Sequence, residues 1–217
     1  MIIKNMDWNT IWKSESFYTD LYPTKNIVYF YKHHLSPLKK NIKILDCGCG
    51  NGRNFKFLIE KGFDVYGTDI SPKIINENKK KFKRYKSKFK LGDIRSLNFQ
   101  KNFFDVIISE ASLYYQGIED IKKTIEKFHY LLKPGGIIRV YTKSINDNFF
   151  KTFDKRKSTE YKVKKNHWEK GLTLSFLTFK DVKKIFKKFK ELKIGIEEFN
   201  YIDQNKKHSF YIITAKK

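Results

Sequence analysis

The segment Asp46-Cys47-Gly48-Cys49-Gly50-Asn51-Gly52 places three glycines at alternate positions directly after a short apolar run. Glycine adopts backbone angles that other residues avoid, and it lets a ligand approach the main chain closely. A helix is expected to follow at once, and the first turn of a helix offers free N–H groups and a positive dipole end. The spacing therefore predicts a loop that cradles a polar small molecule.

Two common phosphate-binding loops and a metal centre are excluded by residue type. A nicotinamide fingerprint requires its third glycine where Arg53 stands, and a P-loop requires Gly-Lys followed by Ser or Thr. Cys47 and Cys49 are the two cysteines of the chain, and its five histidines are scattered. A Cys-x-Cys pair without further ligands does not complete a zinc site, so we expect neither a metal nor a disulfide framework.

Two further acids follow predicted strands. Asp69 ends the run Val65–Asp69, 23 residues after Asp46, and Asp93 lies in Leu91-Gly92-Asp93-Ile94. A carboxylate accepts hydrogen bonds from hydroxyl and amino groups. Ligands of open α/β sheets bind outside the carboxyl ends of the strands, so these acids are expected to reach one site.

Two later motifs complete an ordered set over residues 42–142. They are Phe104-Asp105-Val106-Ile107-Ile108-Ser109 and the turn Leu131-Leu132-Lys133-Pro134-Gly135-Gly136. In order and spacing, the set resembles the class I S-adenosylmethionine-dependent methyltransferases. The resemblance implies a Rossmann-like three-layer α/β fold, a seven-stranded, mostly parallel sheet with a C-terminal antiparallel strand, and S-adenosylmethionine as the cofactor.

The resemblance also assigns roles along the motifs. The glycines would approach the methionine part of the cofactor, Asp46 its ammonium group, and Asp69 the ribose hydroxyls. Asp93, Ile94 and Ile70, which follows Asp69, would frame the adenine. Arg53 has two possible roles, a contact to the cofactor carboxylate or an ion pair exposed to solvent. The expected cofactor-binding residues are Trp12, Tyr18, Asp46, Cys47, Gly48, Cys49, Gly50, Asn51, Gly52, Arg53, Asn54, Asp69, Ile70, Ser71, Asp93, Ile94, Ser109 and Glu110.

The methyl acceptor is expected to meet side chains beyond these motifs. His167 is the candidate general base because its ordinary pKa lies near neutrality, and Tyr114, Tyr115 and Glu110 are the other catalytic candidates. Arg139 has two possible roles, a buried salt bridge or a contact to an anionic substrate. The expected substrate-binding residues are Tyr22, Tyr114, Tyr115, Arg139, Tyr141, Lys143, His167 and Trp168.

Alternating strands and helices must position these residues. Strands are predicted at Ile42–Asp46, Val65–Asp69, Lys88–Leu91, Phe104–Ser109, Ile137–Thr142, Leu192–Tyr201 and Ser209–Ala215. Helices are predicted over 24–35, Arg53–Lys61, from Pro72, over Gly117–Leu132, and from Thr178 or Asp181.

We interpret the whole chain, residues 1–217, as one methyltransferase domain with four parts. Residues 1–40 are an aromatic N-terminal segment that either covers the site as a lid or packs on the sheet. Residues 41–143 are the cofactor-binding core, 144–177 a partly helical insertion on the substrate side, and 178–217 a closing helix and strands.

The composition bounds the class of protein. A net charge of +23 arises almost entirely from lysine, which fits the codon bias of an AT-rich genome better than an arginine-based nucleic-acid site. No apolar run is long enough to cross a bilayer, and the N-terminus lacks the apolar core of a signal peptide. We therefore expect a cytoplasmic bacterial protein, monomeric or homodimeric.

The functional hypothesis is methyl transfer to an oxygen or nitrogen of a small anionic metabolite. A sugar or phosphate-bearing intermediate of bacterial surface polysaccharide synthesis is the specific candidate. An RNA or protein methyltransferase and a non-catalytic cofactor-binding module remain the alternatives.

Overall fold

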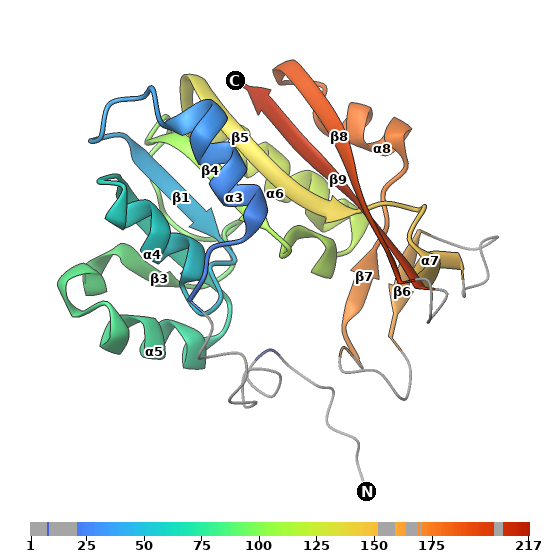
Figure 1. Ribbon diagram of the computed structural model, residues 1–217, viewed down its shortest axis with the longest axis horizontal. Coiled ribbons are helices and arrows are strands. Elements are labelled where there is room, and N and C mark those ends of the chain that lie inside the picture. Colours follow the sequence, from blue (N-terminus) through green and yellow to red (C-terminus); the bar gives the residue numbers. More distant parts are fainter. Residues whose placement is uncertain (1–7, 9–20, 152–158, 164–168, 170, 202–205) are drawn as a thin grey trace, which may run out of the picture.

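Seven strands form one sheet in the computed structural model, in the order β3-β2-β1-β4-β5-β9-β8 (Figure 1). The structure describes residue 8 and residues 21–151, 159–163, 169, 171–201 and 206–217. The strands of this sheet are β1 Lys43–Cys47, β2 Asp64–Asp69, β3 Phe89–Leu91, β4 Phe104–Glu110, β5 Leu132–Lys143, β8 Lys190–Tyr201 and β9 Lys206–Lys216.

The pairing of the strands confirms the predicted fold class. Strands β1 to β5 pair in parallel, β9 runs antiparallel to β5, and β8 runs antiparallel to β9. Ile107 and Ile108 of β4 are fully buried, as expected of a central strand that is covered on both faces.

Helices cover the two faces of the sheet in separate groups (Figure 1). The helices are α3 Lys25–Phe30, α4 Arg53–Glu60, α5 Pro72–Lys81, α6 Ile118–Leu131, α7 Asn148–Lys151 and α8 Phe179–Ile185. Residues Ile27, Phe55 and Ile74 of α3, α4 and α5 share one apolar cluster, while Phe128 and Val182 of α6 and α8 belong to the other. The sheet therefore lies between two hydrophobic layers.

Local signals set the helix starts. Ser71 accepts from the backbone N–H of Ile74 and precedes Pro72, the predicted cap and first helical residue. Thr178 and Asp181 form a reciprocal capping box, which places the start of α8 at Phe179. The predicted first helix is divided, because α3 ends at Phe30 and a π-helical turn continues over Tyr31–Leu35.

The predicted Lys-Pro-Gly-Gly turn is wrong in one respect, since it lies inside β5 rather than before it. Leu132 pairs with Phe104 and Ile137 with Val106, so the intervening residues bulge out of the ladder. Gly135 has φ +74° there, and its N–H donates to the carbonyl of Lys217. The bulge lets one strand contain a sequence that resembles a turn.

The predicted insertion contains both helix and strand. After α7, strands β6 Glu160–Lys162 and β7 Thr173–Ser175 form a separate antiparallel pair. Within the described residues, no helix is long and apolar enough to cross a membrane.

Candidate active site

A cavity of about 370 Å³ lies at the carboxyl ends of β1, β2 and β4. Its walls come from the glycine loop after β1, the ends of β2 and β3, the start of α6, and Trp8. Eight residues expected to bind a ligand line it: Cys47, Gly48, Gly50, Asp69, Ile70, Asp93, Ile94 and Tyr115. The structure therefore brings most of the separated motifs to one cavity.

The glycine loop has backbone angles that favour glycine, and a side chain at Gly48 or Gly52 would collide with a neighbouring residue. Gly48, Gly50 and Gly52 all have positive φ, at +75°, +48° and +81°. A Cβ on Gly48 would lie 2.3 Å from the Cβ of Ser112, and one on Gly52 would lie 2.7 Å from the Phe82 ring. The N–H groups of Gly48 and Cys49 both donate to the carbonyl of Thr68, which fixes the loop against β2.

Asp69 connects that loop to the end of β2. One carboxylate oxygen accepts from the N–H of Gly50 at 3.1 Å, and the other accepts from the N–H of Ser71 at 2.9 Å. Burial raises the pKa of Asp69, although these backbone donors favour its charged form. The carboxylate is thus held at the cavity wall with lone pairs still available to a ligand.

Asp93 lines the cavity together with Arg95, a cation that the sequence motifs do not predict. Arg95 binds the Asp93 carboxylate through its Nε at 3.0 Å and its Nη2 at 2.5 Å, and it also contacts Asp120. The hydrogen bonds from Arg95 lower the pKa of Asp93. Beside this pair, Ile94 is buried and Ile70 is 53% exposed, so an apolar surface faces the same cavity.

Asp46 and Glu110 are buried acids behind the cavity wall. Asp46 Oδ2 and Glu110 Oε1 have no hydrogen-bond partner among the described residues, while Glu110 Oε2 accepts from Thr24 at 3.4 Å. Burial raises the pKa of Asp46 to about 7, with Asp69 adding to the shift and Arg53 opposing it. Burial likewise raises the pKa of Glu110 to about 7, with Arg139 opposing. Two acceptors thus remain unsatisfied near the glycine loop.

Several expected cofactor residues contact the protein instead of lining the cavity. Asn54 accepts from the N–H of Thr24 at 3.0 Å, and Asn51 accepts from the N–H of Arg53 at 3.2 Å. Besides Asp46 and Glu110, seven of the expected cofactor residues that the structure describes do not line the cavity: Cys49, Asn51, Gly52, Arg53, Asn54, Ser71 and Ser109.

The cysteines are buried thiols within this loop. Burial raises the pKa of Cys47 to about 12, and it also raises the pKa of Cys49. Both are free. No cluster of potential metal ligands occurs among the residues described here.

Aromatic side chains form the wall opposite the glycines. The Tyr115 hydroxyl donates to Glu169 at 2.5 Å, and the ring meets Trp8 edge-on at 4.6 Å between centroids. Tyr114 packs beside Tyr115 at 4.4 Å but does not line the cavity. Tyr22 is 83% exposed and lies away from it. The candidates Trp12, Tyr18, His167 and Trp168 lie outside the described residues.

The β5 candidates face the α3 side of the sheet, where none of them reaches this cavity. Lys143 is buried against Asp147 at 3.3 Å and lies over the Phe210 ring at 4.8 Å. Tyr141 stacks on Phe210 at 4.5 Å. Arg139 lines a second cavity. Their alternation on one face was predicted, but their distance from the glycine loop was not.

Three residues that build the site were not predicted from the sequence. The Ser112 hydroxyl donates to the carbonyl of Cys47 at 2.9 Å, and the Asn78 amide donates to the carbonyl of Gly50 at 2.7 Å. Arg95 is the third. Ser112 and Asn78 lie 65 and 28 positions from the residues they contact, so no local pattern announces them.

Comparisons with known proteins agree with this geometry. Residues 44–136, from β1 into β5, match the family model described as a methyltransferase domain. Residues 44–136 therefore carry a methyltransferase domain of the class I type. It is 32% identical over 105 residues to the phosphoethanolamine N-methyltransferase of Plasmodium falciparum, a match that covers 48% of this chain and 40% of that protein. The chain spans less than half the length of the curated relatives that it matches.

Solved structures share the methyltransferase fold over most of the chain. A SAM-dependent methyltransferase from Methanosarcina mazei superposes with a TM-score of 0.69 at 21% identity, covering 91% of this chain and 98% of that one. Phosphoethanolamine N-methyltransferase 2 of Haemonchus contortus, solved with phosphomonomethylethanolamine and S-adenosylhomocysteine, gives 0.67 at 16% identity, covering 96% and 57%.

Proposed function

We propose that the protein transfers a methyl group from S-adenosylmethionine to a small, anionic acceptor. The observation that carries this proposal is the cavity between the positive-φ glycines and the Asp69 carboxylate. It combines a main-chain surface open to close approach, a fixed carboxylate, and an apolar patch at Ile70 and Ile94. A nucleoside joined to an amino acid presents the complementary groups.

The residues present fit that cofactor. Asp69 would accept from the ribose hydroxyls, and Ile70 and Ile94 would contact the adenine. The unpartnered oxygen of Asp46 would accept from an ammonium group, either directly or through water. When bound, the cofactor supplies a methyl group on a positively charged sulfur, and attack on it must be in line with the bond that breaks.

The aromatic wall would orient the acceptor and exclude water. The Tyr115 hydroxyl donates to Glu169 and is also hydrogen-bonded to the Tyr114 hydroxyl, so its position at the cavity wall is fixed. Its remaining lone pair would accept from an N–H or O–H of the acceptor. Trp8 meets the Tyr115 ring edge-on and narrows the cavity above it. Exclusion of water and alignment of the nucleophile are the main contributions that a protein makes to such a displacement.

The attacked atom is proposed to be nitrogen or oxygen. The relatives named for phosphoethanolamine support an amine that carries a phosphate, while a sugar or phosphate-bearing intermediate of bacterial surface polysaccharide synthesis is the second acceptor class. A hydroxyl acceptor needs a base that takes its proton, and an alkyl amine, which is protonated near neutral pH, must also give up a proton before its nitrogen can attack. A phosphate or carboxylate oxygen needs no base. Glu110 and His167 are the candidate bases.

Cofactor binding is the first test. Thermal shift and calorimetry with S-adenosylmethionine and S-adenosylhomocysteine should both show binding, and a ligand at about 100 times its dissociation constant adds about 2.7 kcal/mol of stability. The assay is repeated at low and high salt with bulk RNA. Stabilisation by RNA that falls steeply with salt would favour an RNA methyltransferase instead.

Turnover is the second test. Transfer of an isotope-labelled methyl group is followed over phosphate-bearing amines, sugar phosphates and their unphosphorylated analogues. Tyr115→Phe should lower kcat/KM with little change in cofactor affinity, whereas Tyr130→Phe, which alters an exposed ring of α6 outside the cavity, should not lower kcat/KM. Equal losses in both variants would contradict the assignment of Tyr115. Cofactor binding without transfer to any tested acceptor would favour a cofactor-binding module.

A further inference from the structure

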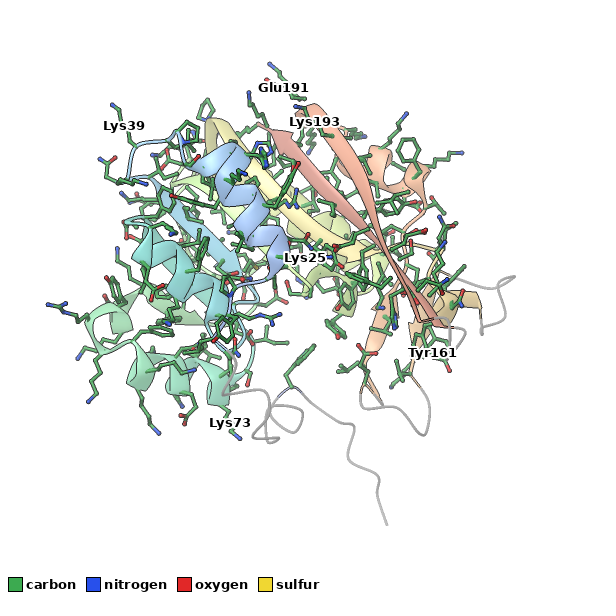
Figure 2. All side chains as sticks on the ribbon, in the orientation of Figure 1. Lys25, Lys39, Lys73, Tyr161, Glu191 and Lys193 are labelled. Atoms are coloured by element: carbon green, nitrogen blue, oxygen red, sulfur yellow. The ribbon has the colours of Figure 1, made fainter. Side chains whose placement is uncertain are left out.

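A second cavity, of about 630 Å³, lies on the α3 side of the sheet. It is formed by α3 and the turn after it, together with β5, β9 and β8. Lys25 and Lys193 both line it, and Figure 2 shows them apart from each other, on α3 and on β8. It shares no lining residue with the first cavity, so it is a separate feature of the fold.

Arg139 is the buried cation of this second cavity. Arg139 is only 4% exposed, and its guanidinium carbon lies 5.4 Å from the centre of the Phe30 ring. Nη1 donates to Thr214 at 3.0 Å, but Nε is buried without a hydrogen-bond partner. Within the described part of the chain, no carboxylate forms a salt bridge with Arg139. A buried guanidinium with an unused donor is costly unless an acceptor reaches it.

The acid that lines this cavity is already engaged. Glu197 accepts from Asn26 at 3.1 Å, lies 2.6 Å from Lys25 Nζ, and is also hydrogen-bonded by Tyr141. Its attachment to Lys25 and Asn26 at one end of α3 leaves it little capacity to neutralise Arg139.

Two acids act electrostatically on Arg139: Glu110, whose own pKa burial raises to about 7, and Glu197 in the cavity wall. The remaining charged side chains of the lining add positive charge. Lys193 lines the cavity from β8, and His34 lines it from the turn after α3. Burial lowers the pKa of His34, and the charges of Arg139, Lys193, His33 and Lys216 lower it further. Lys25, Arg139 and Lys193 are opposed by Glu197 alone among the described lining residues, which leaves two positive charges in excess.

We propose that this second cavity binds the phosphate or carboxylate group of a small molecule, held by Arg139 with Lys193 and His34. A guanidinium presents a fork of donors that suits both anions, and the Phe30 ring fixes its plane. The cavity has room for a metabolite beyond the anionic group itself. The site is separate from the proposed cofactor and acceptor site, so the two assignments stand or fall independently.

The test uses the full chain saturated with S-adenosylhomocysteine. Inorganic phosphate, succinate and a neutral polyol are titrated by calorimetry, which separates the two anion classes from non-specific effects. In parallel, the imidazole of His34, assigned with a His34→Gln variant, is followed by NMR. The bound anion should raise the pKa of His34 because it offsets the charges of Arg139 and Lys193.

Two variants probe the site and one serves as a control. Arg139→Met keeps an unbranched apolar stem but removes the guanidinium group, and it should weaken anion binding at least about tenfold, as expected for lost charge-assisted hydrogen bonds. Lys193→Glu lies at an exposed position and cannot disturb the core, so its loss of affinity reports charge alone. Lys90→Glu makes the same charge change at an exposed position on β3 and should leave affinity unchanged.

Three results would overturn the proposal. They are anion binding that survives Arg139→Met, binding that weakens equally in Lys193→Glu and Lys90→Glu, and the absence of binding by both anions. Anion binding that appears only without S-adenosylhomocysteine would place the anion in the first cavity and would also overturn it.

Discussion

Ser112 occupies the space into which a side chain on Gly48 would project: a Cβ on Gly48 would lie 2.3 Å from the Ser112 Cβ. The Ser112 hydroxyl in turn donates to the carbonyl of Cys47, the residue before this glycine. The segment after β4 thus supports the glycine loop from outside. The absence of a side chain at position 48 is required by this contact as well as by the backbone angle.

We predict that Gly48→Ala lowers stability and cofactor affinity by more than the strain of a positive φ alone would. Gly48 and Gly135 have nearly equal φ values, +75° and +74°, but no atom lies within 4 Å of a Cβ placed on Gly135. Gly135→Ala should therefore cost only about 1–2 kcal/mol of backbone strain. Gly48→Ala should lower Tm further and weaken binding of S-adenosylhomocysteine. Equal Tm and affinity in the two variants would refute this interpretation.

We predict that Asp69→Ala loses cofactor affinity by about a hundredfold, because each hydrogen bond to a charged group contributes about 1.5–3 kcal/mol. Calorimetry with S-adenosylhomocysteine measures the loss. Asp105→Asn is the matched control: Asp105 accepts from Lys43 and Lys133 in the same sheet, outside the cavity. It should reduce stability without reducing affinity. Full cofactor affinity in Asp69→Ala would remove the ribose assignment.

We predict that the ligand-free protein loses stability as pH rises from about 4 to about 7. The pKa values of Asp46 and Glu110 are raised to about 7 from 3.8 and 4.5, so the folded chain holds protons that the unfolded chain has released. The free energy of unfolding must then decrease through this window, by an order of a few kcal/mol, and level off above it.

Urea unfolding at a series of pH values measures this loss. The double variant Asp46→Asn, Glu110→Gln removes both titrations and should therefore show a shallower decrease over the same range. Parallel curves for the variant and the natural sequence would contradict the prediction.

We predict that Arg139→Met leaves folding intact or makes the protein more stable. The guanidinium is buried with one hydrogen bond from Nη1, and methionine replaces it with a shorter, uncharged and apolar chain. Thr214→Val removes the partner instead and should cost about 1–3 kcal/mol, because it leaves more of the buried cation unsatisfied. Thermal unfolding compares the two, and greater damage from Arg139→Met would contradict this ordering.

Much of the fold could be predicted because its signals are local. Alternating apolar runs and helical stripes place the strands and helices, and Ser71 with Pro72 marks the start of α5. The wrong boundary at Leu132 has a tertiary cause, since pairing with Phe104 extends β5 through a sequence of Pro and Gly. Neither residue type nor periodicity encodes that pairing.

Part of the candidate site could likewise be predicted from the sequence. The sequence by itself determined the glycine spacing and the acids at or just after the carboxyl ends of β1, β2 and β3, because the carboxyl ends of parallel strands lie at one edge of the sheet. It also determined that Arg139 and Lys143 share a face, because strands alternate with period two.

Only the tertiary structure decided what those side chains meet. It links Arg95 to Asp120, supports Gly48 with Ser112, buries Asp46 near Glu110, and places Arg139 in a second cavity with Lys193. The physical reason is that alternation fixes the face of a strand on which a side chain lies. Its partners, burial and pKa depend on which distant segment packs against that face.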